Sequence, residues 1–379
     1  MYRSESNPWL HRFACFTALA TLGLIGMGGL VTSKGAGMAV PDWPTSYGYN
    51  MFALPFKFWK GGAFYEHTHR LAASGVGLLT VVLAVWLWRK EARGWLRWWG
   101  MIALFSVVLQ GVLGGLRVVW FQDVLGIFHA ALAQLFLVLV CAIALFTSKW
   151  WTGGLAGSLP TVGALGETRP AGLNLRRIFL FTTVLIFLQL VLGATMRHQH
   201  AGLAIPDFPL AYGKLWPAMD ADSVAAYNAR RLELTAANPV TAAQIGLQMA
   251  HRLMALVILI CAGAVAWRAW RGSTDRPSGE SGSLFRRLAF AWLALILVQA
   301  ALGAWTVWSN KAADVATAHV LVGAFSLVTG VLGCLICFRR FTRVTRAQGA
   351  SGSKAACTNS PPARRNGRRV LPPIARRTE

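Results

Sequence analysis

Four polar residues open an otherwise apolar segment of the chain. The stretch AFYEHTHRLAASGVGLLTVVLAVWLW, residues 63 to 88, contains Glu66, His67, His69 and Arg70 within five positions. Ionisable groups are costly at membrane depth, and where a membrane helix keeps them they are usually functional. Imidazoles bind metals and a carboxylate moves protons, so this cluster marks a candidate site at the start of a membrane helix.

The composition of the chain indicates an integral membrane protein. Its 379 residues are 55% hydrophobic, and the mean hydropathy is +0.48, above that of an ordinary globular domain. The net charge of +23 comes from Lys and Arg residues that lie between apolar runs, so we expect no nucleic-acid partner. The six cysteines lie in or beside apolar segments or in the tail, and predict no disulfide framework.

Eight apolar segments reach the length of about 20 residues that a bilayer-spanning helix needs. The first is too long for a signal-peptide core, so we expect it to be retained as a helix. The predicted helices are Phe13 to Thr32, Glu66 to Trp88, Trp98 to Val119, Val124 to Thr147, Arg177 to Met196, Ile245 to Ala266, Leu288 to Trp308 and Asp314 to Phe338.

Basic residues between these segments predict the orientation. Most of them fall on one side, which the positive-inside rule assigns to the cytoplasm together with both termini. The short N-terminus lacks an Arg- and Ser-rich amphipathic stretch, which favours a bacterial plasma membrane. Residues 339–379 are rich in Arg, Ser, Gly and Pro, and we expect a disordered basic tail attracted to anionic lipid.

The chain repeats itself. The loop GAGMAVPDWPTSYG returns as part of ATMRHQHAGLAIPDFPLAYG, HRLAA returns as HRLMA, and QGVLGG returns as QAALGA. The sequence therefore predicts an all-α integral membrane protein of eight transmembrane helices in two tandem, pseudo-symmetric four-helix bundles. Its expected parts are an N-terminal segment (1–12), a first bundle (13–147), a linker (148–176), a second bundle (177–338) and the tail (339–379).

Four histidines occupy matched places in this repeat. His69, His129, His251 and His319 open the second, fourth, sixth and eighth predicted helices. In an antiparallel four-helix bundle the second and fourth helices run parallel and face each other across the core, where such bundles build cofactor sites. One such histidine would more often be a core residue, but two matched pairs favour a binding site.

A pair of imidazoles suits haem better than other metals. Zinc and copper sites usually recruit further His, Cys or carboxylate ligands, whereas haem iron needs only one or two axial side chains because the porphyrin supplies four nitrogens. We therefore favour haem with two histidine ligands in each half. Gly111, Gly114, Gly115 and Gly303 allow close approach of a macrocycle or, equally, of another helix.

Arg70 and Arg252 follow the first histidine of each half. Their guanidinium groups are candidates to bind haem propionates, with snorkelling to lipid head groups as the alternative.

The two halves differ at one position. Glu66 lies three residues before His69, so both share a helix face and the carboxylate should point toward whatever His69 binds. The matched residue in the second half is the neutral Gln248. The asymmetry suggests chemistry in the first half and electron storage or structure in the second. Alternatively, Glu66 has no chemical role and its negative charge is only stabilised by the positive N-terminal end of the helix dipole.

The Glu-x-x-His-Arg motif at Glu66, the GAGMAVPDWPTSYG loop and the matched histidines resemble the haem A synthase family (the CtaA/Cox15 type) over residues 13–338. The resemblance implies that the C8 methyl group of haem O is oxidised to a formyl group, giving haem A for terminal oxidase assembly. It implies haem b on His251 and His319, the substrate haem O on His69 and His129, and an essential Glu66.

Partners follow from the same resemblance. We expect a haem O-producing farnesyltransferase, the cytochrome oxidase assembly machinery, membrane lipid and an electron donor that the sequence does not identify. Whether the chain forms a homo-oligomer stays open. The outer loops 33–65 and 197–244 contain no cysteine, so the thiol-linked electron delivery proposed for some relatives is in doubt here. The segment DSVAAYNARRLEL in the second loop predicts an interfacial helix.

Two chemical routes and two rival functions stay open. Either an axial histidine leaves the iron to admit oxygen, or the methyl group loses electrons and is trapped by water, with Glu66 stabilising charge or accepting a proton. A dihaem cytochrome that only transfers electrons would need the same four histidines. A transporter would show discontinuous helices and polar groups at the midplane.

Overall fold

The computed structural model describes residues 7–152, 169–234, 239–274 and 280–358. Within these ranges the chain is helical, and its only β-type pairings are isolated bridges between Ser46 and Tyr49 and between Ala211 and Lys214. The predicted all-α class is therefore confirmed.

Eight of the described helices are long and apolar enough to cross a membrane, one for each predicted segment. Polar residues next to the apolar spans continue the backbone hydrogen bonding, so the helices extend past the predicted ends. They are α1 (Pro8–Ser33), α2 (Gly61–Lys90), α3 (Gly94–Trp120), α4 (Asp123–Thr147), α7 (Arg169–His198), α9 (Ala242–Thr274), α10 (Glu280–Trp308) and α11 (Ala313–Thr358).

Two of these extensions change the prediction. Helix α2 begins five residues before Glu66, so the polar cluster lies inside the helix rather than at its first residue. Helix α11 continues past Phe338 to Thr358, where the sequence predicted disorder. Adding residues to an existing helix avoids the cost of nucleation, which explains how a polar segment can prolong a membrane helix. Residues 359–379 lie outside the described ranges.

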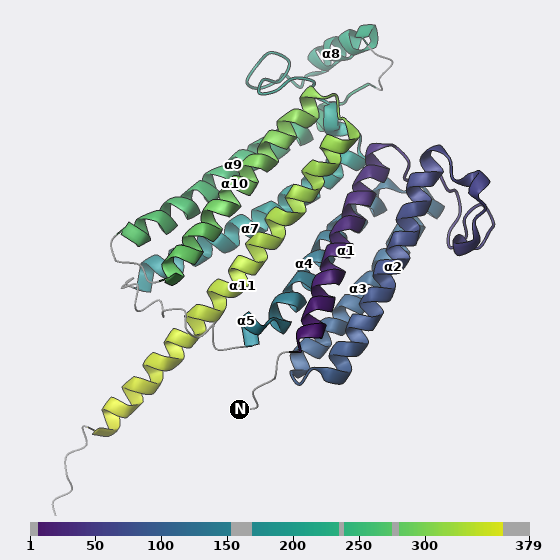
Figure 1. The fold of residues 1–379 in the computed structure, drawn as a ribbon. Coiled ribbons are helices and arrows are strands. Elements are labelled where there is room, and N and C mark those ends of the chain that lie inside the picture. Colours follow the sequence, from purple (N-terminus) through teal and green to yellow (C-terminus); the bar gives the residue numbers. More distant parts are fainter. Residues whose placement is uncertain (1–6, 153–168, 235–238, 275–279, 359–379) are drawn as a thin grey trace, which may run out of the picture.

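The helices pack in two sets of four. Helices α1 to α4 form one closed ring of neighbours, and α7, α9, α10 and α11 form the other. The sets meet where α1 and α4 contact α11 and where α4 contacts α7 (Figure 1). A small core of Ile25, Leu137 and Ala324 joins them. These contacts suit two four-helix bundles, whose tandem pseudo-symmetry stays a prediction.

Each set has its own apolar core. Leu83, Leu87 and Leu96 are buried in the first, whereas Phe179 and Trp292 stack in the second with ring centroids 4.4 Å apart. The indole N–H of Trp292 is satisfied by the Ser326 carbonyl at 2.9 Å. Both cores lie away from the loop end of the helices, which leaves that end for polar groups.

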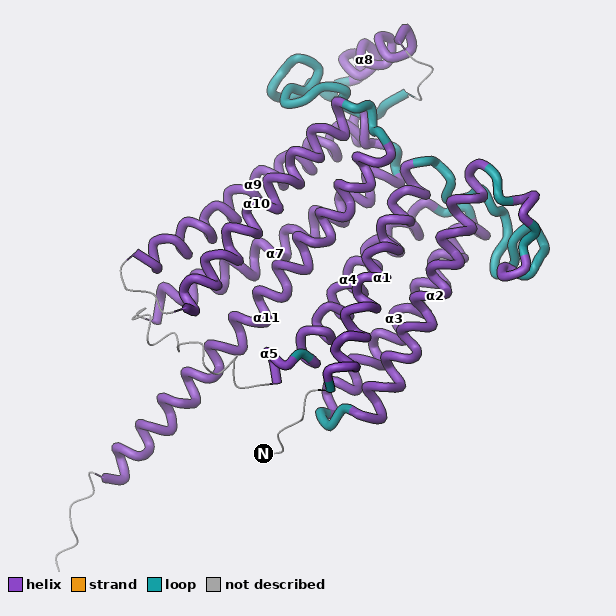
Figure 2. Tube along the Cα trace, viewed as in Figure 1, coloured by secondary structure: helices purple, strands orange, loops and turns teal. Residues whose placement is uncertain are grey.

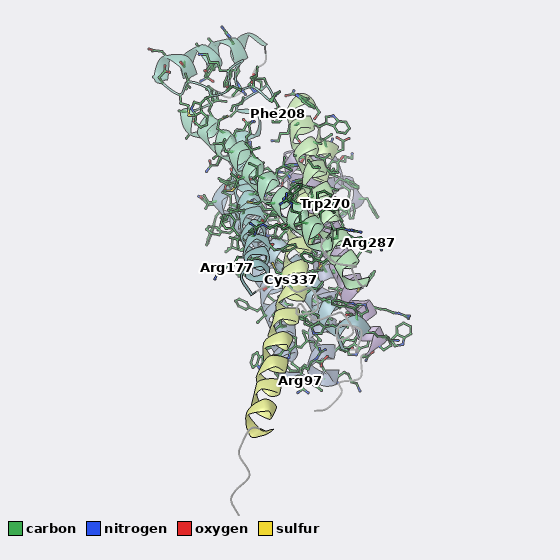
Figure 3. All side chains as sticks on the ribbon, turned by 90° about the vertical axis from the view of Figure 1, so that its left-hand side faces the viewer. Arg97, Arg177, Phe208, Trp270, Arg287 and Cys337 are labelled. Atoms are coloured by element: carbon green, nitrogen blue, oxygen red, sulfur yellow. The ribbon has the colours of Figure 1, made fainter. Side chains whose placement is uncertain are left out.

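The long loops lie together at one end of the helices (Figure 2). They contain the short helices η1 (Met51–Ala53), η2 (Phe56–Phe58), η4 (Ala201–Leu203) and α8 (Ala221–Leu234). Helix α8 confirms that DSVAAYNARRLEL is helical. Figure 3 shows Phe208 at this end and Arg97 near the other. The predicted linker begins with α5 (Lys149–Thr152), and its residues 153–168 lie outside the described ranges.

Candidate functional site

The structure brings the four predicted histidines together in two pairs. His69 on α2 lies near enough to His129 on α4 to interact with it electrostatically, and His251 on α9 is related in the same way to His319 on α11. All four side chains are partly buried. Each pair comes from helices of one four-helix set, as the repeat predicts.

Each imidazole rests against a glycine of the neighbouring helix. A Cβ atom added at any of these glycines would lie 3.0 to 3.4 Å from the Cε1 atom of the ring. The contacts are Gly28 with His69, Gly114 with His129, Gly193 with His251 and Gly303 with His319. A side chain at Gly28, Gly114 or Gly303 would crowd the ring, whereas one at Gly193 would make an ordinary contact, so the glycines leave room for the imidazoles.

The glycines predicted from sequence have different roles. Gly114 and Gly303 accommodate imidazoles, whereas Gly115 accommodates Trp43, whose ring would come within 2.2 Å of an added Cβ atom. Nothing lies within 4 Å of one at Gly111. Sequence reasoning missed Gly28 and Gly193 because they lie on α1 and α7, which carry none of the four histidines, although both stand at matched places in the repeat.

Several imidazole nitrogens have no protein partner. The Nδ1 atoms of His69, His251 and His319 are buried without a hydrogen bond, and leaving a buried polar atom unsatisfied costs about 1–3 kcal/mol. His129 differs, since its Nδ1 lies 3.2 Å from the Gln110 carbonyl. Unsatisfied buried imidazoles fit a site that a ligand completes.

The donor set fits haem iron. Zinc and copper sites usually require three or more His, Cys, Asp or Glu ligands. Within the described ranges no such group is placed to hold a metal ion. Two opposed imidazoles suffice for an iron whose other four ligands come from a porphyrin. The residues present therefore fit haem in either half.

Glu66 holds the loop between α1 and α2, called the first outer loop because the sequence predicts it on the outer side of the membrane. Its side chain is 5% exposed; Oε2 accepts a hydrogen bond from the Val40 amide at 2.9 Å, and Oε1 pairs with Arg70 at 2.7 Å. The sequence predicted a carboxylate directed at whatever His69 binds, but in the structure one oxygen binds the loop amide of Val40 and the other binds Arg70 on the same helix.

Gln248 makes the matching contact in the second half. Its Oε1 accepts a hydrogen bond from the Ile205 amide at 2.6 Å, and its Nε2 donates to the carbonyls of Gly202 and Ile205 at 3.4 and 3.3 Å. Carboxylate and amide thus have the same anchoring role. They differ in that the Glu66 contact includes a buried ion pair.

The arginines after the histidines bind loop carbonyls. Arg70 donates to Asp42, Thr45 and Val40 at 2.7, 3.1 and 3.0 Å, and Arg252 donates to Leu210 and Asp207 at 2.9 and 2.7 Å. Both were predicted to meet haem propionates or lipid head groups. In the structure these donors fasten the loops to the helices, so a propionate would have to share or displace a carbonyl.

Each loop is a rigid turn built on an aspartate. Asp42 accepts hydrogen bonds from the amides of Tyr47 and Gly48 at 2.6 and 2.8 Å, and Asp207 accepts from Tyr212 and Gly213 at 2.7 and 2.9 Å. Both tyrosines have φ of 53°, a left-handed conformation that these bonds support. This geometry explains the repeated PDxPxxYG pattern.

The charge of Asp42 is also stabilised. Burial alone would raise the pKa of Asp42, but hydrogen bonds from Thr45, Gly48 and Tyr47 outweigh it, and the pKa falls below its usual value.

The remaining loop-end histidines contact protein groups. His67 is fully buried, lies against Trp59 with ring centroids 4.7 Å apart, and has Nδ1 3.5 Å from the Ser46 hydroxyl. His198 is buried against Gly126 at the start of α4, with Nδ1 3.9 Å from Asp123. His200 is exposed. We predicted no ligand role for these three.

Eight apolar helices define a multi-pass membrane protein, and its two histidine pairs lie where helix bundles build cofactor sites. The sequence model of the COX15-CtaA family, cytochrome oxidase assembly protein, matches residues 11–331. The chain belongs to this family, and the resemblance predicted from its motifs is confirmed.

Bacterial relatives align along most of the chain. A protein named Heme A synthase from Geobacillus kaustophilus is 28% identical over 326 residues, covering 84% of this chain and 88% of that one. Proteins of the same name from Lysinibacillus sphaericus and Bacillus licheniformis are 24% and 26% identical, and each match covers 86% of this chain and 94% of the relative.

Proposed function

We propose that this protein is a haem A synthase, which oxidises the C8 methyl group of haem O to a formyl group and so supplies haem A for cytochrome oxidase assembly. Membership of the family and the shared name of its relatives support this proposal. The observation that carries it is the pair of imidazoles in each half, every one seated on a glycine.

The two pairs have different roles in this proposal. His251 and His319 hold a resident haem b, and His69 and His129 hold the haem O substrate. Haem b supplies one-electron transfer when it is bound. The glycine cradles fix the imidazoles, and the loops anchored by Glu66 and Gln248 cover the outer ends of the bundles, where they restrict water. A haem O-producing farnesyltransferase would supply the substrate.

Glu66 is the candidate catalytic residue. It shares a face of α2 with His69, and its buried carboxylate is held in place by Arg70 and the Val40 amide. Oxidation of a methyl group releases protons, and a fixed carboxylate beside the substrate accepts one or stabilises positive charge.

The proposed setting is a bacterial plasma membrane with both termini in the cytoplasm, because the basic residues cluster on that side. A reporter that fluoresces only in the cytoplasm should work when fused after Glu379 and fail when inserted after Leu215, which is 87% exposed in the second outer loop. The reverse pattern would invert the topology.

Chromatography of extracted haems tests the function. The full chain is co-expressed with a haem O-producing farnesyltransferase in cells that lack haem A, and formyl-bearing haem A should appear. A His69→Ala variant is the negative control. Haem O alone beside a stably expressed protein would contradict the proposal.

The alternative is a dihaem cytochrome that only transfers electrons, which the family and the name shared by the relatives do not favour. Glu66 and Gln248 anchor their loops alike, so the loop contacts alone do not separate the two functions. That protein would bind two haems and be reduced and reoxidised without forming haem A.

A further inference from the structure

Three cations lie close together at the loop end, where the two helix sets meet: Arg117 and Arg197 both interact electrostatically with His198, and Lys311 does so with Arg197. They are Arg117 near the end of α3, Arg197 near the end of α7, and Lys311 between α10 and α11; we call them the cation cluster. Arg197 crosses between the sets, because its Nη2 donates to the Gly29 carbonyl at 2.7 Å and to the Ser33 hydroxyl at 2.5 Å, both on α1.

The cluster carries more positive than negative charge. Within the described ranges its ion pairs involve one carboxylate, Asp123, which lies 3.6 Å from Arg117 and is 44% exposed. The Arg117 side chain is only 16% exposed, and its Nε atom is buried without a hydrogen-bond partner. A buried, unsatisfied guanidinium donor is costly unless an anion completes it.

The cluster lies next to both histidine pairs. Arg117 interacts electrostatically with His129, and Arg197 does so with His319. Arg117 also lies over the first outer loop, with Nη1 2.7 Å from where a Cβ atom of Gly37 would be. Lys311 approaches the matched loop glycine, Gly202, with Cδ 4.0 Å from that position. In the first half one cation, Arg117, thus lies near both the loop and a histidine, whereas in the second half Lys311 lies near the loop and Arg197 near the histidine.

Crowding of like charges supports an anion-binding role. Burial, and then the neighbouring charge of Arg197, lowers the pKa of Lys311. A bound anion would relieve both effects, because it replaces lost hydration and offsets the repulsion. Arg70 and Arg252 donate to carbonyls or to Glu66, and the Nη2 of Arg197 also donates to a carbonyl, whereas the Nε of Arg117 has no hydrogen-bond partner.

We propose that the cation cluster binds the carboxylates of the two tetrapyrroles, with Arg117 serving the first half and Arg197 and Lys311 the second. This inference rests on the proposed haem sites and assigns the propionate role to residues other than Arg70 and Arg252. A guanidinium is suited to it, since its fork matches a carboxylate.

Binding of haem b and of its dimethyl ester tests the proposal. The ester keeps the ring and iron but lacks both carboxylate charges. The full-length protein, purified without haem, is titrated with each compound and followed by Soret absorbance. The wild type should bind haem b about tenfold or more tightly than the ester, because charge-assisted hydrogen bonds are lost with the ester. Equal affinities would overturn the proposal.

Variants assign the cations to the two halves. In a His251→Ala background, where only the first site is intact, Arg117→Gln should reduce the preference for haem b to near one and Arg197→Gln should not. In a His69→Ala background, where only the second site is intact, Arg197→Gln should reduce the preference for haem b to near one and Arg117→Gln should not. Arg230→Gln removes the same charge from the exposed surface of α8 and should preserve the preference in both. Variants that keep the wild-type preference would overturn the proposal.

Two further readings separate folding and function from this inference. Folded variants should bind the ester as the wild type does, because the ester does not use the cations. A misfolded variant would bind neither haem b nor the ester. In that case the affinities of the wild type for haem b and for the ester would decide whether the proposal holds. A cluster-dependent preference without haem A formation would reject only the proposed function. Haem A formation without a preference would reject only the cluster, and no haem binding at all would reject both.

Discussion

Glu66 and Gln248 hold matched loops through the same kind of backbone contact, and they differ mainly in charge. Each accepts a hydrogen bond from a loop amide, of Val40 or Ile205. An amide therefore satisfies the geometry of this position, and a carboxylate is not needed to hold the loop. What the carboxylate adds is a buried charge paired with Arg70, which is the property that chemistry at the substrate could use.

Replacing Glu66 by Gln tests this separation. The variant should fold and retain its haem, because Gln248 shows that an amide can anchor the loop, while haem A formation should fall by about 10²–10⁴-fold, the usual contribution of general acid-base catalysis. Haem content is measured by absorbance and haem A by chromatography. Gln248→Glu, which adds a charge to the second half, is the matched control and should retain activity. Full haem A formation by Glu66→Gln would show that the residue is only an anchor.

At this scale the sequence predicted which residues matter better than what they touch. The four histidines were found because duplication placed them at matched positions. The hydrogen-bond partners of Glu66 and Arg70 were not predicted, because Val40 lies 26 residues before Glu66 and Asp42 lies 28 residues before Arg70. That proximity depends on how the loop folds back, which residue spacing along α2 does not report.

The neighbouring helices position the imidazoles through four glycines. The glycines on α1, α3, α7 and α10 each leave room for a ring on the next helix. Glycine in a helix costs about 1 kcal/mol relative to alanine, so keeping it at these contacts has a packing reason. The helices therefore serve as walls for the rings as well as membrane spans.

A series of alanine substitutions tests these walls. Gly28→Ala and Gly303→Ala would place a methyl group 3.0 and 3.1 Å from their imidazoles, whereas Gly193→Ala would leave 3.4 Å. Overpacking costs about 1–3 kcal/mol, so haem affinity should fall by roughly tenfold in the first two and less in the third. Gly111→Ala meets nothing within 4 Å and is the control. Equal losses in all four would mean that the cradle contacts are irrelevant.

The first outer loop should respond to pH through Asp42. Because its folded pKa lies below the unfolded value of about 3.9, the charged carboxylate stabilises the fold above that pH, and the stabilisation is lost as pH falls through the folded pKa. Asp42→Asn should therefore melt a few degrees below the wild type at pH 7, with a gap that narrows as the pH falls below about 3.9. Melting in detergent across this range measures it. Asp222→Asn, on the exposed part of α8, should show no such gap; a gap for Asp42→Asn that is constant with pH would contradict this account.

Hydropathy located each of the eight candidate membrane helices in the described part of the chain, because a bilayer imposes length and apolarity together. It did not locate the ends. Hydrogen bonding continues into polar residues, so α2 begins before Glu66 and α11 passes Phe338. The glycine contacts also lay beyond sequence reasoning, since they depend on how neighbouring helices are rotated.

The whole molecule joins two helix sets through a narrow shared core and polar contacts at the loop end. Helix α4 carries His129, and α11 carries His319. Across the boundary between the sets, α4 contacts α11 and α7, and α11 also contacts α1. One histidine of each pair is therefore on a helix at the junction and the other on a helix away from it. This arrangement places two sites close together while each keeps its own walls.

Separate sites predict separable losses. In cells that make no haem O, His251→Ala and His319→Ala should lose most of the Soret absorbance of the resident haem b, because each removes one of its two axial ligands. His69→Ala and His129→Ala should keep that absorbance, yet form no haem A when a haem O-producing farnesyltransferase is supplied. His200→Asn changes an exposed histidine with φ of 55°, a conformation that asparagine tolerates, and should match the wild type in both measurements. Because the second pair lacks a carboxylate at position 248, it suits electron transfer better than methyl oxidation. If the first pair proved to hold the resident haem, the roles of the two halves would have to be exchanged and Glu66 would lie beside the wrong haem.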